Sequence, residues 1–138
     1  MREINRFYLE IKNIEELKKV NLENNELKVK LLKKIDFNLN KFFYKQIGKN
    51  HRWTDRLSWN DNMWINYVSD QSVNTFVLMH NKNLAGYFER IYNKQSNEFE
   101  IAYFGILHEY RNKKFGAYLL SKAIELSFRD GAKRVWVH

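Results

Sequence analysis

The chain has 138 residues, enough for one domain, and its 44% hydrophobic and 16% aromatic content can supply one core. The absence of cysteine excludes disulfides and cysteine-based sites, and the net charge of +8 favours an anionic partner, either a nucleic acid or a phosphorylated small molecule. The longest apolar run, Ile101–Leu107, is far shorter than the roughly 20 residues of a membrane span, and the charged start lacks the apolar stretch of a signal peptide, so we expect a cytoplasmic protein without membrane contact.

The first third of the chain gives weak secondary-structure signals. Weak alternation of apolar and polar residues predicts a strand over Phe7–Ile11, and helical spacing predicts a short helix over Ile14–Val20. Residues 21–36 are highly charged and fit neither pattern well. Their lysines are typical of a solvated face.

Two helices are predicted in the middle of the chain. The first covers Asn38–Ile47, and Gly48 just past its end is a candidate C-cap. A tryptophan-rich segment follows, in which Ser58 and Asp61 resemble a capping box for a second helix over about Trp59–Val68.

The second half gives clearer signals, with Gly86 marking a bulge or a close backbone approach. The predicted elements are three strands, a helix and a fourth strand: Val73–His80, Leu84–Tyr92, Glu98–Leu107, Phe115–Arg129 and Lys133–His138. This order predicts a single α/β (α+β) domain over residues 1–138, with a central sheet. The chain ends in its last strand, so we expect a C-terminally incomplete domain with an uncovered sheet edge, which would favour a homodimer.

The turn between the third strand and the last helix has the features of an anion site. The first backbone N–H groups of a helix lack internal partners and carry partial positive charge. Arg111, Lys113 and Lys114 add formal charge beside them, and Gly116 allows a phosphate or the neighbouring strand to approach closely. The pattern predicts a diphosphate site.

The segment Arg111-Asn112-Lys113-Lys114-Phe115-Gly116-Ala117 resembles the acyl-CoA signature R/Q-x-x-G-x-G/A of the GNAT N-acetyltransferase superfamily. The strand before it (Phe104-Gly105-Ile106) and the Gly131–His138 ending are similar to the fourth and fifth strands of that family. Lys114 stands where the family has its middle glycine. The resemblance is close over about residues 75–138.

The resemblance implies a GNAT-like mixed, mostly antiparallel sheet flanked by helices, and lacking the family's C-terminal helix and last strands. It implies an N-acetyltransferase that passes an acetyl group from acetyl-CoA to an amine by direct attack on the thioester. Phe104 and Ile106 would pair with pantetheine through their backbones. The diphosphate would be held by Arg111, Asn112, Lys113, Lys114, Phe115, Gly116 and Ala117.

A general base helps such a reaction, because an amine is mostly protonated at neutral pH. Glu100 is the first candidate, since period-2 spacing places it on one face with Ala102, Phe104 and Ile106; Glu89 is the second. Both carboxylates could instead face solvent or pair with nearby cations.

The resemblance also implies that aromatic residues of the middle segment line an acceptor pocket, although such residues are more often core: Trp53, Trp59, Trp64 and Tyr67. The four histidines lack metal-ligand spacing, so we expect no metal. One alternative is a GNAT-like domain that binds acyl-CoA without catalysis. Another is nucleic-acid binding, which only the net charge supports, so we expect no nucleic-acid partner.

Overall fold

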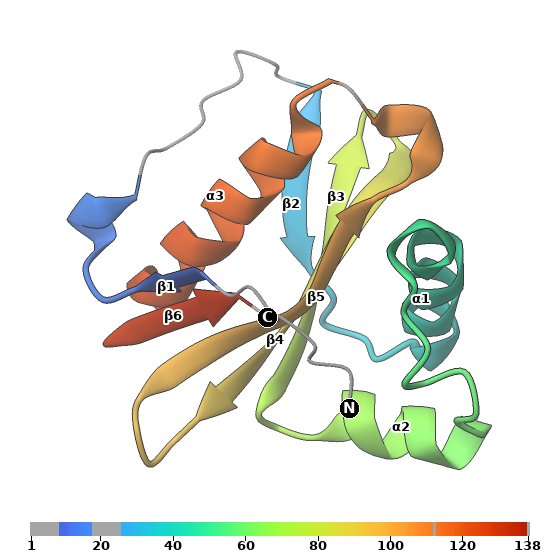
Figure 1. Cartoon of the computed structure of the whole chain (residues 1–138), viewed down its shortest axis with the longest axis horizontal. Coiled ribbons are helices and arrows are strands. Elements are labelled where there is room, and N and C mark those ends of the chain that lie inside the picture. The colour runs from blue at the N-terminus through green and yellow to red at the C-terminus, as the bar shows by residue number, and fades with distance from the viewer. Residues whose placement is uncertain (1–8, 18–25, 112, 138) are drawn as a thin grey trace, which may run out of the picture.

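The computed structural model describes residues 9–17, 26–111 and 113–137, which form a single six-stranded sheet with helices on both faces (Figure 1). The strand order is β1-β6-β5-β4-β3-β2, antiparallel except for the parallel pair β5 and β6. The elements are β1 (Leu9–Ile11), the 3-10 helix η1 (Ile14–Glu16), β2 (Leu27–Leu31), α1 (Phe37–His51), α2 (Asp61–Ser69), β3 (Val73–His80), β4 (Asn83–Asn93), β5 (Glu98–Ile106), the 3-10 helix η2 (His108–Tyr110), α3 (Phe115–Arg129) and β6 (Arg134–Val137).

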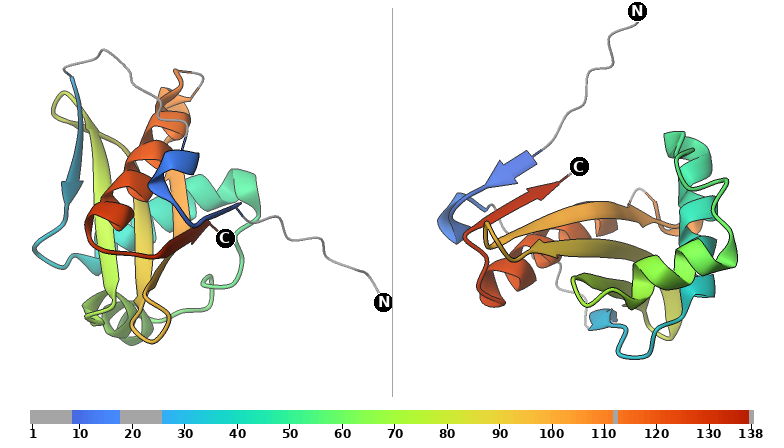
Figure 2. Two further views of the ribbon diagram at one scale, coloured as in Figure 1. Left: turned by 90° about the vertical axis from the view of Figure 1, so that its left-hand side faces the viewer. Right: turned by 90° about the horizontal axis from the view of Figure 1, so that it is seen from below.

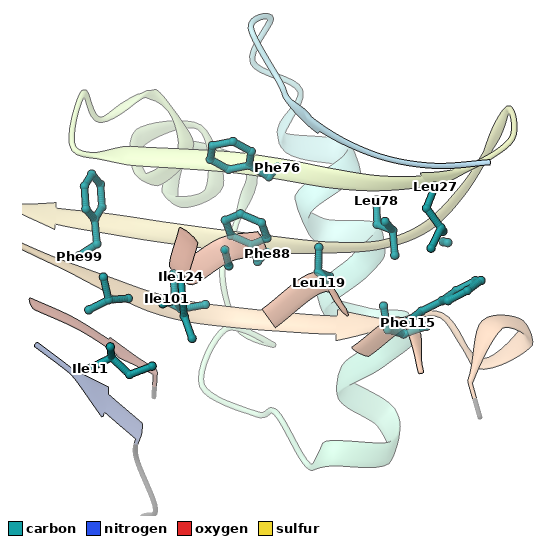
Figure 3. Packing of buried hydrophobic residues seen from close by; sticks show 14 of the residues in the cluster. Ile11, Leu27, Phe76, Leu78, Phe88, Phe99, Ile101, Phe115, Leu119 and Ile124 are labelled. Carbon is teal, nitrogen blue, oxygen red and sulfur yellow. The ribbon is translucent and has the colours of Figure 1, made fainter. Parts of the chain in front are cut away.

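The two faces of the sheet carry separate apolar clusters. Helix α3 packs on one face, where Leu119 and Ile124 contact sheet residues such as Phe88 (Figure 3). Helix α1 packs on the other face through Phe43 and Ile47, and α2 lies beside it (Figures 1 and 2). This layered arrangement buries the apolar stripe of each helix. None of the helices in the described part of the chain combines the length and apolarity needed to traverse a bilayer.

The expected mixed α/β fold is confirmed, and its clearest elements have the expected bounds. Strand β3 and helix α3 begin and end where the sequence predicts. Gly86 shows both features expected of it: the β3–β4 register shifts beside it, and a Cβ there would lie 2.6 Å from the Gly105 carbonyl oxygen.

Three predictions about helix ends are wrong. The helix expected over Ile14–Val20 is only the short η1, because Leu17 is already extended; residues 18–20 lie outside the described part of the chain. Gly48 is inside α1 rather than at its end. Trp53 packs closely on Gly48, and a Cβ on this glycine would lie 3.0 Å from the Trp53 Cβ. Asn60, not Ser58, caps α2 by accepting from the Met63 N–H at 2.9 Å.

The outer strands of the sheet correct one further expectation and add a strand that was not predicted. The edge of β6, expected to be uncovered, pairs with β1 in antiparallel register from Leu9↔Val137 to Ile11↔Val135. Strand β2 lies within the charged stretch that gave no prediction, and its exposed Lys28 and Lys30 protect the opposite edge of the sheet from pairing. Homodimerization stays a prediction.

Candidate active site

A groove with a volume of about 480 Å³ lies where β5 ends and α3 begins. Its walls come from the end of β5, the β5–α3 turn, the first turn of α3 and the last residue of α1. The lining residues are His51, Phe104, Gly105, Ile106, Tyr110, Arg111, Lys114, Phe115 and Gly116. Six of the nine expected cofactor residues are therefore among them.

The other three expected cofactor residues differ in position. Lys113 and Ala117 are exposed and lie next in the chain to residues that line the groove. Asn112 lies outside the described residues.

The first turn of α3 presents backbone donors to this groove. Lys114 is the N-cap residue, and its carbonyl accepts the first helical hydrogen bond, from the Tyr118 N–H at 3.1 Å. The N–H groups of Phe115, Gly116 and Ala117 therefore have no acceptor within the helix. A Cβ on Gly116 would meet only Ile106 Cγ1, at 3.8 Å, an ordinary contact distance, so the packing of the protein would tolerate a side chain at this position. Gly116 is thus not required by contact with the neighbouring strand, and an approaching ligand is the remaining reason expected for it.

Lys114 adopts a left-handed conformation, with φ of 64°. Glycine reaches this region without strain, whereas a residue with a Cβ pays a steric cost. This conformation explains why the related signature has glycine at the position that Lys114 occupies. The lysine keeps the backbone turn and adds a positive charge at the groove.

One edge of β5 is open beside the groove. The pairing of β5 with β6 runs from Glu98↔Arg134 to Ile101↔Val137, so within the described residues the segment 102–106 has no partner on that side. The side chains of Phe104 and Ile106 lie on the α3 face, in or against its apolar cluster. Their backbone groups at the open edge can pair with an extended ligand.

A bulge in β5 changes the face on which Glu100 lies. Glu89 pairs with Tyr103 but Arg90 pairs with Ile101, so Ala102 is an extra residue in the strand. Ile101 and Phe104 consequently share the α3 face, although their spacing is odd. The expectation that Glu100 shares a face with Phe104 and Ile106 is therefore wrong: Glu100 lies on the α1/α2 face, beside Ile91 and Trp136 in a surface hollow.

Glu89 is completely buried and has a full set of partners. Its Oε1 accepts from Arg56 Nη1 at 2.9 Å and from the Tyr67 hydroxyl at 2.7 Å, and its Oε2 accepts from Asn40 Nδ2 at 2.9 Å. Burial raises the pKa of Tyr67, and the adjacent Glu89 charge raises it further. The phenol therefore stays protonated and keeps donating to the carboxylate.

Five aromatic rings surround the guanidinium of Arg56. The Arg56 Cζ lies 4.2–5.8 Å from the ring centres of Tyr44, Trp59, Trp64, Tyr67 and Tyr103. Three of the four aromatics expected at an acceptor pocket, Trp59, Trp64 and Tyr67, thus enclose this arginine, which occupies the space between them. Sequence reasoning missed Arg56; an arginine inside an aromatic-rich segment is the signal that could have found it.

Sequence reasoning did not select two further residues, Asp55 and His51, of which His51 lines the groove. The Asp55 carboxylate accepts from the Tyr44 hydroxyl at 3.0 Å and from the Tyr103 hydroxyl. His51 lines the groove, stacks on Trp53 with ring centres 5.8 Å apart, and has its Nε2 3.4 Å from Arg111 Nη2. Burial lowers the pKa of His51, and the Arg111 charge lowers it further, so the ring is neutral at pH 7. In the described part of the chain, histidines and carboxylates nowhere gather in threes as metal ligands would.

Comparisons with known proteins identify the family and the fold. A sequence profile of the acetyltransferase (GNAT) family matches residues 36–138. A comparison with curated protein sequences finds no match.

Solved structures with the same fold include three acetyltransferases. An aminoglycoside acetyltransferase from an uncultured soil metagenomic sample, in complex with sisomicin, has a TM-score of 0.68 at 13% identity, over 83% of this chain and 78% of its own. A ribosomal-protein-alanine N-acetyltransferase from Brucella melitensis biovar Abortus has a TM-score of 0.60 at 11% identity, over 83% of this chain and 80% of its own. A Bacillus subtilis acetyltransferase in complex with CoA has a TM-score of 0.56 at 18% identity, over 77% of this chain and 60% of its own. Identities this low establish the fold alone. The family follows from the sequence profile, which covers most of the chain, so the chain belongs to the acetyltransferase (GNAT) family.

Proposed function

We propose that this protein transfers an acetyl group from acetyl-CoA to an amine. The neutral amine nitrogen attacks the thioester carbonyl, a C–N bond forms and the C–S bond breaks. CoA leaves as the thiol once the proton lost by the nitrogen has reached the sulfur. The observation that carries the proposal is the groove at the β5–α3 turn, where free helix N–H groups lie beside an open strand edge.

The groove offers complementary groups to two parts of the CoA molecule. The diphosphate would accept hydrogen bonds from the N–H groups at the start of α3, and Arg111, Lys113 and Lys114 would supply positive charge. Asn112 stays an expected member of this site from the sequence signature alone. The pantetheine arm carries amide groups, and these would pair with the backbone of Phe104 and Ile106 at the open edge of β5. A CoA-bound acetyltransferase with the same fold supports this assignment.

Glu100 is the proposed general base, acting through water. The β5 bulge turns its side chain to the α1/α2 face, outside the groove and two residues before the open edge of β5 begins, so a water molecule would have to relay the proton. Glu89, the second candidate, is enclosed and paired with Arg56, so taking up a proton would leave a buried cation without its counter-ion. We assign Glu89 a supporting rather than a proton-transfer role.

The competing function is a domain that binds acyl-CoA without transferring the acyl group. Titration calorimetry with acetyl-CoA tests binding, and release of free CoA thiol in the presence of a panel of amines tests transfer. Saturable binding together with amine-dependent thiol release supports the transferase. Binding without thiol release for any amine would favour the binding domain, and failure to bind acetyl-CoA would contradict both.

Replacing Glu100 by glutamine tests the base. Glu100→Gln preserves shape but cannot accept a proton, so we expect kcat to fall by about 10²-fold, within the usual contribution of a general base. The pH profile should lose the limb in which wild-type activity rises as the base deprotonates. Acetyl-CoA affinity should stay unchanged. A Glu100→Gln profile that superimposes on the wild-type profile would remove Glu100 from the mechanism.

A further inference from the structure

Asp55 is an exposed carboxylate held in place by two phenols. It lies in the loop between α1 and α2, and it accepts hydrogen bonds from Tyr44 of α1 and Tyr103 of β5. Burial alone would raise the pKa of Asp55, but the hydrogen bonds from Tyr103 and Tyr44 outweigh this effect and lower it. Asp55 is therefore a fixed anion at neutral pH.

The charge of Asp55 is available to a ligand. The charge of the neighbouring Arg56 helps to lower the Asp55 pKa, but the Arg56 guanidinium makes its ion pair with Glu89, at 2.9 Å, rather than with Asp55. Each Asp55 oxygen accepts from one phenol, and the backbone N–H of Asp55 also donates to the carboxylate, which leaves one of its four lone pairs for a ligand. In a chain with a net charge of +8, such an anion is a local exception that can attract a cation.

Aromatic rings connect Asp55 to the groove. Trp53 packs edge-on against Tyr103 with ring centres 4.7 Å apart, and it stacks on His51, which lines the groove. Tyr103 also directly precedes Phe104 at the open edge of β5. A carboxylate beside aromatic rings is a chemical environment that recognises ammonium groups.

We propose that Asp55 binds the second ammonium group of a diamine or polyamine acceptor, while the first amine of the same molecule reacts. This inference rests on the proposed transferase function and names the acceptor class for it. The reacting nitrogen must be neutral, so Asp55 anchors a different nitrogen and orients the molecule along Trp53 and Tyr103. An acceptor with a single amine lacks the group that Asp55 recognises.

A matched pair of ligands tests the anchor. 1,5-Diaminopentane and pentylamine have the same carbon chain and differ by one ammonium group. Titration calorimetry of each into the CoA-loaded protein should give about tenfold tighter binding of the diamine, the size expected for one ion pair beside aromatic rings. Asp55→Asn should lower the affinity for the diamine to that for pentylamine and leave pentylamine binding unchanged.

Asp61→Asn is the control, because it removes the same charge from the exposed first turn of α2, where Asp61 pairs with Lys41 at 3.3 Å. It should keep the diamine preference. Asp55→Ser, which still offers an oxygen to the phenols, serves as a second variant should Asp55→Asn not fold. Equal wild-type affinities for the two ligands, a preference that survives in the folded Asp55 variant, or an equal loss in Asp61→Asn would each overturn the anchor.

Turnover separates this inference from the proposed function. A wild-type protein that prefers the diamine in binding but releases no CoA thiol with any amine would contradict the transferase, while the loss of that preference in Asp55→Asn would still assign diamine binding to Asp55. Thiol release with both amines at equal KM would support the transferase and contradict the anchor.

Discussion

At the scale of single residues, Lys114 combines a conformational cost with a useful charge. Its φ of 64° is one that a side chain makes unfavourable, and its position at the start of α3 brings its ammonium group to the groove. The sequence alone raised the question of whether lysine fits where the related signature has glycine. The structure answers that the turn is kept and the lysine adopts the glycine-like conformation.

Lys114→Gly should therefore stabilise the fold by about 0.5–1 kcal/mol. This is the free energy gained by relieving the backbone strain, reduced by the conformational entropy that glycine adds to the unfolded chain. Urea denaturation followed by tryptophan fluorescence measures this difference. Lys113→Gly is the matched control, since positive φ is recorded for Lys114 but not for Lys113, and it should be neutral or destabilising. Equal effects of the two substitutions would mean that Lys114 is not strained.

The face of Glu100 shows why residue-level prediction failed at one position of β5. Strict alternation places Glu100 with Phe104 and Ile106, and nothing in the sequence marks Ala102 as an extra residue. A bulge depends on how two strands fit together, here between Glu89 and Arg90 of β4 and their partners. Gly86, by contrast, marked its irregularity in advance because glycine is otherwise costly inside a strand.

At the scale of elements, strong local patterns were sufficient and weak ones were not. Helix α3 has an apolar stripe and ends before Gly131, whose φ is 99°, so the sequence predicts its bounds correctly. The segment from Ile14 has helical spacing but forms only one 3-10 turn before Leu17 becomes extended. Strand β2 was missed because its alternating lysines also suit a solvated segment, and only pairing with β3 makes it a strand.

The Arg56–Glu89 pair connects four elements of the α1/α2 face. Glu89 on β4 contacts Asn40 of α1, Arg56 of the following loop and Tyr67 of α2. Asn40 also donates to Thr75 of β3 at 2.9 Å. The pair therefore fixes both helices, and the loop that carries Asp55, on the sheet.

Arg56→Met should destabilise the fold by about 3–5 kcal/mol, because it leaves the Glu89 charge buried without its cation. The flexible, apolar methionine suits the aromatic surroundings, so the loss should come from the charge rather than from packing. Arg56→Met combined with Glu89→Gln should recover a large part of the lost stability, as measured by urea denaturation. A double variant as unstable as the sum of the two single variants would show that the residues are not coupled.

At the scale of the whole molecule, the sequence predicted the central sheet and the turn that resembles the acyl-CoA signature. It did not predict the contacts between segments that are distant in the chain. Strand β1 covers β6 through a pairing between the two ends of the chain, which no local pattern reveals. The Arg56–Glu89 network likewise joins residues that are distant in sequence and meet only in the folded molecule. Most of the groove was predictable, because eight of its nine lining residues follow one another along one strand, one turn and one helix, whereas His51 comes from α1 and was missed.

The net charge of +8 leaves open whether a CoA ligand is held by the whole positive surface or by one site. Two double charge reversals separate these cases, because each changes the net charge from +8 to +4. Lys113→Glu with Lys114→Glu acts at the turn, whereas Lys33→Glu with Lys34→Glu acts on exposed lysines after β2. If the turn binds the diphosphate, the first pair should weaken acetyl-CoA binding by about tenfold or more and the second by about twofold or less, because exposed charges are screened beyond about 10 Å. Titration calorimetry at two salt concentrations provides the measurement. Equal losses that vanish together at high salt would instead assign the affinity to the overall charge of the molecule and contradict a defined diphosphate site.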